Sequence, residues 1–327
     1  MRDRPARLSD FWTPVESIGP VKPEKSCPPE EMRTIRVPAF AKINLCLHIV
    51  GRRPDGYHEL RTIFQSIGLH DTLELALVSR PGIHLECDDA ALPTGRENLV
   101  WRALDAMRQE LRLKRGIRAR LAKQIPVARG LGGGSSDAAA ALLGLLRLAR
   151  RKLPLARLVE LAAGLGADVP FFLFGGRALG VGRGDEIYPL PDRPKRWAVV
   201  VSPATIGVST RDAYRWAGAR LTKRPRAPKL WSFCALCWSP QRGGAPNDFE
   251  APVFARHPRL RRIKRDLLQR GAAKAALAGS GSAVFGLFPN PAQARRAAQG
   301  FPGDQVFVVE TLSRAENRRA FGSREST

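Results

Sequence analysis

The sequence predicts a protein of mixed helices and strands, divided into two domains near residues 189–194. Its length of 327 residues suits one large domain or two ordinary ones. Segments with the two-residue alternation of strands are interleaved with segments that have the spacing of amphipathic helices. Three prolines within residues 189–194 interrupt this pattern and favour two domains with a boundary there.

The predicted elements begin near Thr34. Strands are expected where apolar and β-branched residues alternate or run together, at 35–37, 40–50, 73–78, 83–87, 117–123, 171–181, 197–201 and 305–310, and on both sides of a glycine turn within 272–287. Helices are expected where apolar residues recur every three or four positions, at 98–111, 135–150, 155–165, 211–219, 260–269 and 293–299. The predicted organisation is a flexible extension at 1–33, domains at 34–190 and 195–315, and a tail at 316–327.

Charge is the most unusual global property of the chain. Lysine and arginine total 54 against 30 acidic residues, which gives a net charge of +24. Such a charge attracts nucleic acid, anionic membranes or phosphorylated metabolites. Aromatic residues are few and no block of like charge is long, so we expect a solvated basic surface, with nucleic-acid binding as the alternative. No apolar run is long enough for a transmembrane helix, and none follows the first residue as in a secretory signal.

The cysteines indicate a reducing compartment. Their number, five, is odd, and a chain of this size does not need disulfides, so we expect a cytoplasmic protein. Cys234 and Cys237 form a CxxC pair without a second pair. Zinc or redox chemistry is one interpretation, and two partly buried small residues is the favoured one.

A glycine-dense loop carries the strongest chemical signal. Residues 126–136 read PVARGLGGGSS and run directly into Asp137 and an Ala/Leu helix. Glycines let the backbone approach a ligand, and a helix directs free N–H groups and its positive end towards the preceding loop. This favours an anion cradle, most naturally for a triphosphate, over a turn that merely caps the helix. The Walker lysine and the dinucleotide-binding spacing are both missing.

A lysine and an aspartate in apolar surroundings form the second signal. Lys42 and Asn44 are two positions apart in an apolar strand, so they share one face. A lysine that faces inward needs an anionic partner, whereas at a sheet edge the pair would face solvent. Asp168, expected between a helix and a buried strand, also needs a partner. Lys42 and Asp168 together would suit proton abstraction from a hydroxyl.

A predicted turn presents two aromatic side chains. Pro-Asp-Gly at 54–56 is a strong turn signal, and it is followed by Tyr57 and His58 at the start of a strand. A tyrosine beside a histidine can stack on a base and hydrogen-bond to it, although such pairs also occur as ordinary turn residues.

Taken in order, several segments resemble the GHMP kinase superfamily. They are AKINL (41–45), RPDGYHEL (53–60), ENLVWRA (97–103), PVARGLGGGSSDAAAAL (126–142), LGADVPFF (165–172), PNDFE (246–250) and AGSGSAVF (278–285). The similarity covers roughly residues 34–315. The Gly-Ser loop is typical of the whole superfamily. AKINL, DGYHEL and LGADVPFF together are similar to the branch that phosphorylates diphosphocytidyl-methylerythritol in non-mevalonate isoprenoid synthesis.

The resemblance implies a two-domain α+β fold with the ATP loop in the first domain, a ferredoxin-like second domain and the active site in the cleft between them. It implies transfer of the γ-phosphoryl group of ATP, bridged by Mg²⁺, to a tertiary hydroxyl of this small-molecule substrate. Asp168 would accept the hydroxyl proton, and Lys42 would hold Asp168 and the hydroxyl in place. The protein would be a monomer or a homodimer.

The resemblance also implies two sets of binding residues. Those for ATP are Asn98, Lys123, Pro126, Val127, Ala128, Arg129, Gly130, Leu131, Gly132, Gly133, Gly134, Ser135 and Ser136. Those for the substrate are Asn44, Tyr57, His58 and Tyr214, with His58 hydrogen-bonding the cytosine and the two tyrosines stacking on it. A superfamily kinase with another alcohol substrate stays open, since only a base-bearing substrate needs this aromatic clamp. Arg129 departs from the pattern, because the family usually has a small residue there; its side chain could reach a phosphate or point outward.

Overall fold

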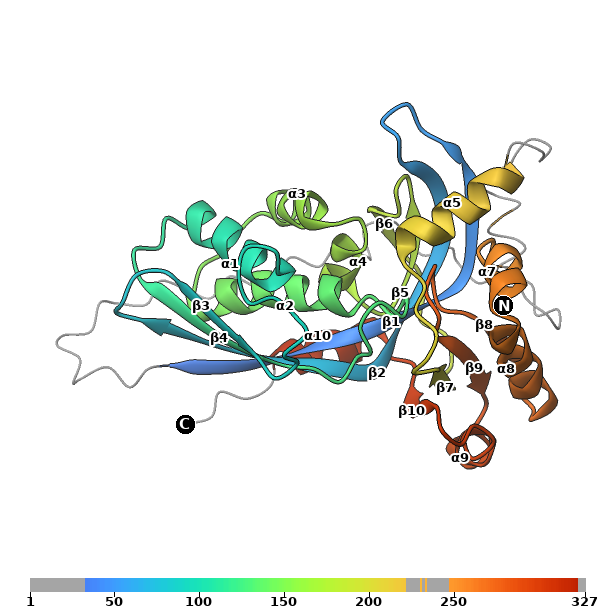
Figure 1. Cartoon of the computed structure of the whole chain (residues 1–327). Helices are drawn as coiled ribbons and strands as arrows, with labels where there is room; N and C mark the ends of the chain where they lie inside the picture. The colour runs from blue at the N-terminus through green and yellow to red at the C-terminus, as the bar shows by residue number, and fades with distance from the viewer. Residues whose placement is uncertain (1–32, 222–229, 231–232, 234–246, 323–327) are drawn as a thin grey trace, which may run out of the picture. The chain divides into compact units, whose positions relative to one another are not determined.

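A computed structural model describes residues 33–221, 230, 233 and 247–322 of the chain. The expected extension at 1–33 therefore falls outside these residues except for Arg33, and the CxxC pair falls outside them entirely. The described residues form one compact unit. Its elements form two sheets with helices, so the mixed composition expected from the sequence is confirmed (Figure 1).

The first sheet is built around two long strands. Its strands are β1 (Thr34–Arg52), β2 (His58–Val78), β3 (Ile83–Cys87), β4 (Gly116–Ala122), β5 (Arg177–Val181) and β6 (Glu186–Pro189). The order is β3-β4-β2-β5-β6, and β1 pairs with β2 along its other edge. Only β3 and β4 run parallel. The separate strands expected at 35–37 and 40–50 are thus one strand, which contains three register shifts.

Helices cover one face of this sheet. They are α1 (Leu99–Glu110), α2 (Gly133–Leu148), α3 (Leu155–Leu165) and α4 (Val169–Phe174), and Figure 1 shows them gathered above β1, β3 and β4. Helix α2 is apolar on nearly every side because it is buried between the sheet and the other helices. The strand expected at 171–181 is wrong in its first part, since 169–174 is helical. A short apolar run fits either structure, and packing decides between them.

The second sheet has the order β10-β7-β9-β8 and is antiparallel throughout. Its strands are β7 (Trp197–Ser202), β8 (Lys274–Leu277), β9 (Val284–Phe288) and β10 (Gln305–Glu310). Both faces are buried. Val199 and Val201 pack with the helices α5 (Thr210–Leu221), α7 (Glu250–Arg256), α8 (Pro258–Gln269) and α9 (Pro291–Ala298). Ala198 and Val200 face the other way and pack with β1 and β2. This explains why β7 is a continuous apolar run rather than an alternating one.

The chain returns to the first sheet after β10. Leu312 donates its N–H to the carbonyl of Ser66, and residues 314–322 form helix α10. Asn317 of this helix lies where a Cβ on Gly175 would be. These residues include much of the predicted tail, whose sequence has too few apolar residues to signal a helix. The predicted boundary falls between β6 and β7, but the bounds of the two domains stay a prediction.

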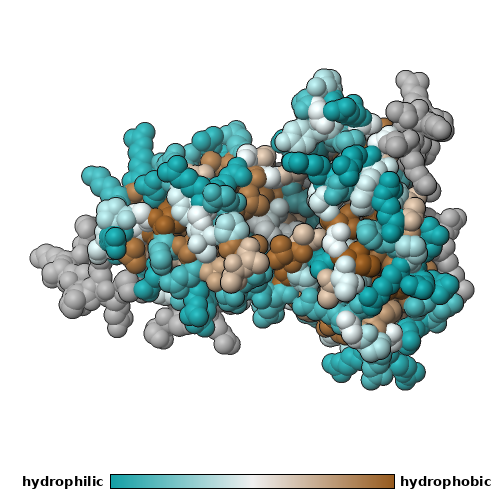
Figure 2. Space-filling view, viewed as in Figure 1, coloured by the Kyte–Doolittle hydropathy of each residue, from teal (hydrophilic) through white to brown (hydrophobic). Residues whose placement is uncertain are grey.

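Two further expectations concern the surface and the cysteines. Hydrophilic residues cover most of the face drawn in Figure 2, as the high charge predicts. No helix among the described residues is long and apolar enough to cross a membrane. Cys87 is free, but Cys46 is disulfide-bonded, so the expectation of reduced cysteines is wrong for Cys46 in this structure.

Candidate active site

A cavity of about 910 Å³ lies between the first sheet with its helices and the elements that follow β7. Both halves of the chain line it, from the strand β1 to the turn at Gly279 and Ser280. Every residue that the resemblance implied for the site lines this cavity, with the exception of Ser136. The fold therefore brings together segments that are far apart in the sequence.

A chain of hydrogen bonds orients Lys42. Its Nζ donates to Oδ1 of Asn44 (2.8 Å), and Nδ2 of Asn44 donates to Oγ1 of Thr62 (2.8 Å), which donates to the carbonyl of Cys46 (2.8 Å). The side chains of Lys42 and Asn44 share one face of β1, as predicted, and both are buried. Both ends of the Asn44 amide are engaged, so this residue positions the ammonium group, and its contact with a substrate stays a prediction.

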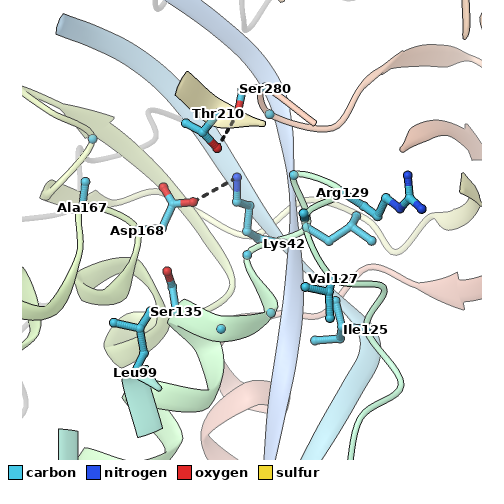
Figure 3. Close-up of a pocket in the computed structure, with 18 of the residues that line it drawn as sticks. Lys42, Leu99, Ile125, Val127, Arg129, Ser135, Ala167, Asp168, Thr210 and Ser280 are labelled. Atoms are coloured by element: carbon cyan, nitrogen blue, oxygen red, sulfur yellow. Dashed lines mark hydrogen bonds and ion pairs between the residues drawn. The ribbon is translucent and has the colours of Figure 1, made fainter. Parts of the chain in front are cut away.

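Asp168 faces Lys42 across the cavity. The Lys42 Nζ lies 3.3 Å from Asp168 Oδ2 (Figure 3). The lysine side chain is 4% exposed and the aspartate side chain 35% exposed. Asp168 directly precedes α4 rather than the expected strand, and its carboxylate does not cap the helix. The pair thus consists of a fixed buried cation and a carboxylate that is open to the cavity.

The glycine loop leads into α2 earlier than expected. Helix α2 begins at Gly133, and Gly132 precedes it with φ of +76° and no side-chain cap. Ser136 is the first residue whose N–H bonds back within the helix, to the carbonyl of Gly132. The N–H groups from Gly132 to Ser135 have no partner within the helix, and they lie at its positive end. This is the geometry of an anion cradle.

The two serines at the start of α2 point to different places. Ser135 lines the cavity, and Figure 3 shows its hydroxyl on the side where Asp168 lies. Ser136 is buried, and its hydroxyl donates to the carbonyl of Phe40 (2.7 Å). One residue is a rotation of about 100° around a helix, which explains the difference. Ser136 therefore joins α2 to β1, and the structure does not support it as a phosphate ligand.

A buried charge cluster lies beneath the loop. Lys123 donates to Asp71, and to Oδ2 of Asp137 at 2.7 Å. Asp71 also accepts the N–H groups of Gln124 (2.5 Å) and Ile125 (2.8 Å). Burial alone would lower the pKa of Lys123, but the charges of Asp137 and Asp71 outweigh it and raise that pKa. Lys123 lines the cavity, but its ammonium group is held by these two acidic side chains, and its contact with the nucleotide stays a prediction.

The charge cluster makes stability depend on pH. Burial and the nearby Asp71 raise the pKa of Asp137 to about 8, whereas an unfolded aspartate titrates near about 3.9. Folding therefore takes up a proton between these values, and the unfolding free energy falls as pH rises from about 4 to about 8. We expect Asp137→Asn, which mimics the neutral acid, to reduce the decrease in unfolding free energy with rising pH. Urea unfolding at pH 5, 6.5 and 8 measures it, and equal slopes for both proteins would contradict the assignment.

Asn98 has a structural task that the sequence did not show. Its Oδ1 accepts the N–H of Val100 (2.8 Å) and caps α1, and its Nδ2 donates to the carbonyl of Pro93 (2.7 Å). The residue lines the cavity, and its contact with a nucleotide stays a prediction. Its amide is nevertheless engaged within the protein, so it shapes this wall of the cavity.

An aromatic cluster forms the other end of the cavity. The Pro-Asp-Gly turn is confirmed, with the N–H of Arg53 donating to the carbonyl of Tyr57 (2.8 Å). Tyr57 is 55% exposed, and Arg183 lies over its ring at 5.0 Å. His58 stacks on Tyr214 with ring centroids 4.7 Å apart. The ring found against Tyr214 is that of His58, and the stacking of the two tyrosines on a base stays a prediction.

Comparison with known proteins supplies the family. The model for GHMP kinases N terminal domain matches residues 98–176, and that for GHMP kinases C terminal matches residues 235–304. The 4-diphosphocytidyl-2-C-methyl-D-erythritol kinase of Solibacter usitatus is 47% identical over 285 residues, covering 86% of this chain and 89% of that protein. The chain belongs to the 4-diphosphocytidyl-2-C-methyl-D-erythritol kinase family of GHMP kinases.

Other members of this kinase family and of the superfamily agree. The kinase of the same name from Moorella thermoacetica is 43% identical and covers 86% of this chain and 100% of that protein. A crystal structure of 4-(cytidine 5'-diphospho)-2C-methyl-D-erythritol kinase matches with a TM-score of 0.72 at 36% identity, covering 85% of this chain and 99% of that one. Homoserine kinase from Cytophaga hutchinsonii matches with a TM-score of 0.63 at 20% identity over 88% of this chain and 98% of that one, which shows the fold alone. The predicted two-domain α+β GHMP kinase fold is confirmed.

Several residues that line the cavity of this GHMP kinase were not among the predicted site residues. Thr210 and Ser280 bond to each other across the cavity wall at 3.2 Å (Figure 3). Arg183 also lines the cavity, and the Val-Gly pair before it gave no indication of a site. Asp71 does not line the cavity but holds Lys123, and it could have been predicted, because a carboxylate within an apolar strand requires a partner.

Proposed function

We propose that this kinase transfers the γ-phosphoryl group of ATP to the 2-hydroxyl of 4-diphosphocytidyl-2-C-methyl-D-erythritol. One observation carries the proposal: the Lys42–Asp168 pair lies in one cavity with a helix-based anion cradle and an aromatic cluster. These three parts correspond to the reacting hydroxyl, the triphosphate and the base. A kinase for a small alcohol without a base would not need the third part.

Asp168 and Lys42 act on the hydroxyl. A tertiary alcohol is a very weak acid, so Asp168 orients it by hydrogen bonding and takes its proton late in the transfer. The carboxylate is open to the cavity, which makes this contact available. Lys42, fixed by Asn44, holds the Asp168 carboxylate in place and offsets the negative charge that develops on the transferring group.

The N–H groups at the start of α2 bind the phosphates. Gly132 must be glycine, because a Cβ there would lie 2.7 Å from the Phe172 ring at a φ of +76°. Mg²⁺ prefers oxygen ligands and usually takes only one or two from the protein. The Ser135 hydroxyl lines the cavity and would fit such a role, and no metal-binding cluster of His, Cys, Asp or Glu occurs among the residues that the structure describes. When bound, Mg²⁺ neutralises phosphate charge.

The aromatic cluster recognises the cytosine. Burial and the nearby Arg52 lower the pKa of His58, so its ring is neutral at pH 7 and can both donate and accept a hydrogen bond. Burial and the charge of Asp168 raise the pKa of Tyr214, so its hydroxyl keeps its proton. The exposed ring of Tyr57 offers a stacking surface, and Arg183 supports it.

Tyr57→Ala is expected to weaken binding of the cytidyl substrate more than it changes turnover. Stacking on a base is worth roughly 1–3 kcal/mol, so KM for that substrate should rise about 5- to 150-fold, with kcat nearly unchanged. Steady-state kinetics measures both constants. Tyr188→Ala is the matched control, since Tyr188 is 53% exposed on β6 away from the cavity. A similar KM for both variants would remove Tyr57 from the site.

The proposed function is tested by ADP release with Mg-ATP and the cytidyl substrate, using galactose, homoserine and mevalonate as controls. Turnover with the cytidyl substrate alone supports it, whereas turnover with another alcohol favours a different kinase of the superfamily. If none of them reacts, a salt-dependent gel shift tests whether the basic surface binds nucleic acid instead. The cytoplasmic location and the monomeric or homodimeric state stay predictions.

A further inference from the structure

Arg129 lies in the glycine loop at 126–136, which is called the phosphate loop from here on. Its side chain points out of the cavity. Figure 3 shows it pointing away from Lys42 and Asp168. Its Nη1 donates to the carbonyl of Ile206 and to Oγ of Ser282 (2.9 Å), and its Nη2 donates to the carbonyl of Ala204 (3.3 Å). The acceptors belong to the segment between β7 and α5 and to the turn between β8 and β9.

The main chain makes the same connection. The carbonyl of Arg129 accepts the N–H of Ala283 (3.2 Å). A Cβ on Gly281 would lie 2.1 Å from the carbonyl carbon of Arg129, and a Cβ on Gly130 would lie 1.9 Å from the carbonyl oxygen of Ala278. The phosphate loop and the turn at 278–283, called the second glycine turn, are therefore in direct backbone contact. The Arg129 guanidinium extends this contact to the segment at 203–209.

The geometry of the guanidinium suits this role. Its planar fork can serve several oxygen acceptors at once, and hydrogen bonds from a charged donor are stronger than neutral ones. None of the three acceptors is a carboxylate, so the positive charge of Arg129 is not neutralised by them. A small residue at this position could make none of these side-chain bonds.

The segment at 203–209 continues directly into α5, which carries Thr210 and Tyr214. Thr210 bonds to Ser280 of the same glycine turn. We propose that Arg129 is a positioning residue that couples the phosphate loop to α5, so that each substrate binds more tightly when the other is present. This inference rests on the proposed function, because it takes the loop as the nucleotide site and α5 as part of the base site.

The coupling arises because both substrates need the same segments of the protein to be ordered, and the conformational entropy of those segments is lost only once. A nucleotide that fixes the loop also fixes Arg129, and through its three bonds the segment that positions Tyr214. The second substrate then binds to a helix that is already ordered, so it loses less conformational entropy. Thermodynamic linkage requires the same factor in the opposite order of binding.

Calorimetry on the full chain tests this coupling. The Kd of the cytidyl substrate is measured without and with a saturating non-hydrolysable ATP analogue. We expect the analogue to lower this Kd by about tenfold in the wild type, a typical coupling, and by less than about twofold in Arg129→Ala. Arg80→Ala is the matched control, because Arg80 is an exposed arginine in the turn after β2. The substitution removes the same charge far from the loop. Arg80→Ala should keep the wild-type ratio of the Kd values measured without and with the analogue.

A second variant covers the case in which Arg129→Ala does not fold. Ser282→Ala removes one of the three acceptors and should reduce the ratio part of the way, whereas adding Ser282→Ala to Arg129→Ala should cause no further loss. A wild-type ratio near one, or equal ratios in the wild type and Arg129→Ala, would overturn the inference. Those results would leave the proposed function intact as long as the wild type turns over the cytidyl substrate. A wild type that neither binds nor phosphorylates it would contradict the proposed function itself.

Discussion

Asp168→Asn is expected to lower kcat by about 10²- to 10⁴-fold, while ATP binding stays within about twofold of the wild type. The amide has nearly the same shape, so it still fits beside Lys42, but it cannot accept the hydroxyl proton. The side chain lies opposite Lys42 rather than in the glycine loop, which explains why the nucleotide should still bind. Single-turnover kinetics and calorimetry with an ATP analogue measure the two quantities.

Glu97→Gln serves as the control for Asp168→Asn. It makes the same chemical change in an exposed carboxylate that lines the same cavity, and it should leave kcat within about twofold of the wild type. Near-normal turnover of Asp168→Asn would show that another group accepts the proton. An equal loss in both variants would point to a general effect of charge in the cavity.

Gly130→Ala is expected to disable the phosphate loop. Gly130 has φ of +81°, and a Cβ there would lie 1.9 Å from the carbonyl oxygen of Ala278. Backbone atoms cannot yield as a flexible side chain can, so the loop must move away from the second glycine turn. We expect kcat/KM for ATP to fall by at least about a hundredfold, since misplacement of about 1 Å can cost that much. Steady-state kinetics and thermal unfolding measure the effect.

Gly303→Ala is the matched control for this change. Gly303 also has φ of +81°, but a Cβ there has no atom within 4 Å. It should therefore lose only the roughly 1–2 kcal/mol of left-handed strain and keep full activity. If Gly130→Ala behaved like Gly303→Ala, the close contact between the two glycine turns would not matter for the reaction.

Local signals in the sequence predicted much of the secondary structure. The turn at 54–56 and the helix at 155–165 were expected where they occur, because proline, aspartate and glycine favour few backbone conformations and α3 has clear apolar spacing. The same holds for the glycine loop. Every residue expected at the site except Ser136 lines the cavity, and most of these residues lie in the short motifs on which the family resemblance rests.

The directions of individual side chains could not be predicted in this way. Ser135 and Ser136 are neighbours in the sequence, yet one lines the cavity and the other bonds to β1. The helix at 169–174 resembles a strand as a sequence, and only its packing against α2 and α3 distinguishes the two. These outcomes depend on contacts between residues that are far apart in the chain.

The amino-acid sequence by itself determined the phosphate loop, the aromatic turn and the membership of the kinase family, because each rests on a short run of residues. The tertiary structure alone decided that Lys123 is held by Asp71 and Asp137, and that Arg129 reaches the segment before α5. The direction of a charged side chain depends on where its hydrogen-bond and ion-pair partners lie. Those partners are assembled by the pairing of strands and the packing of helices, which no local pattern encodes.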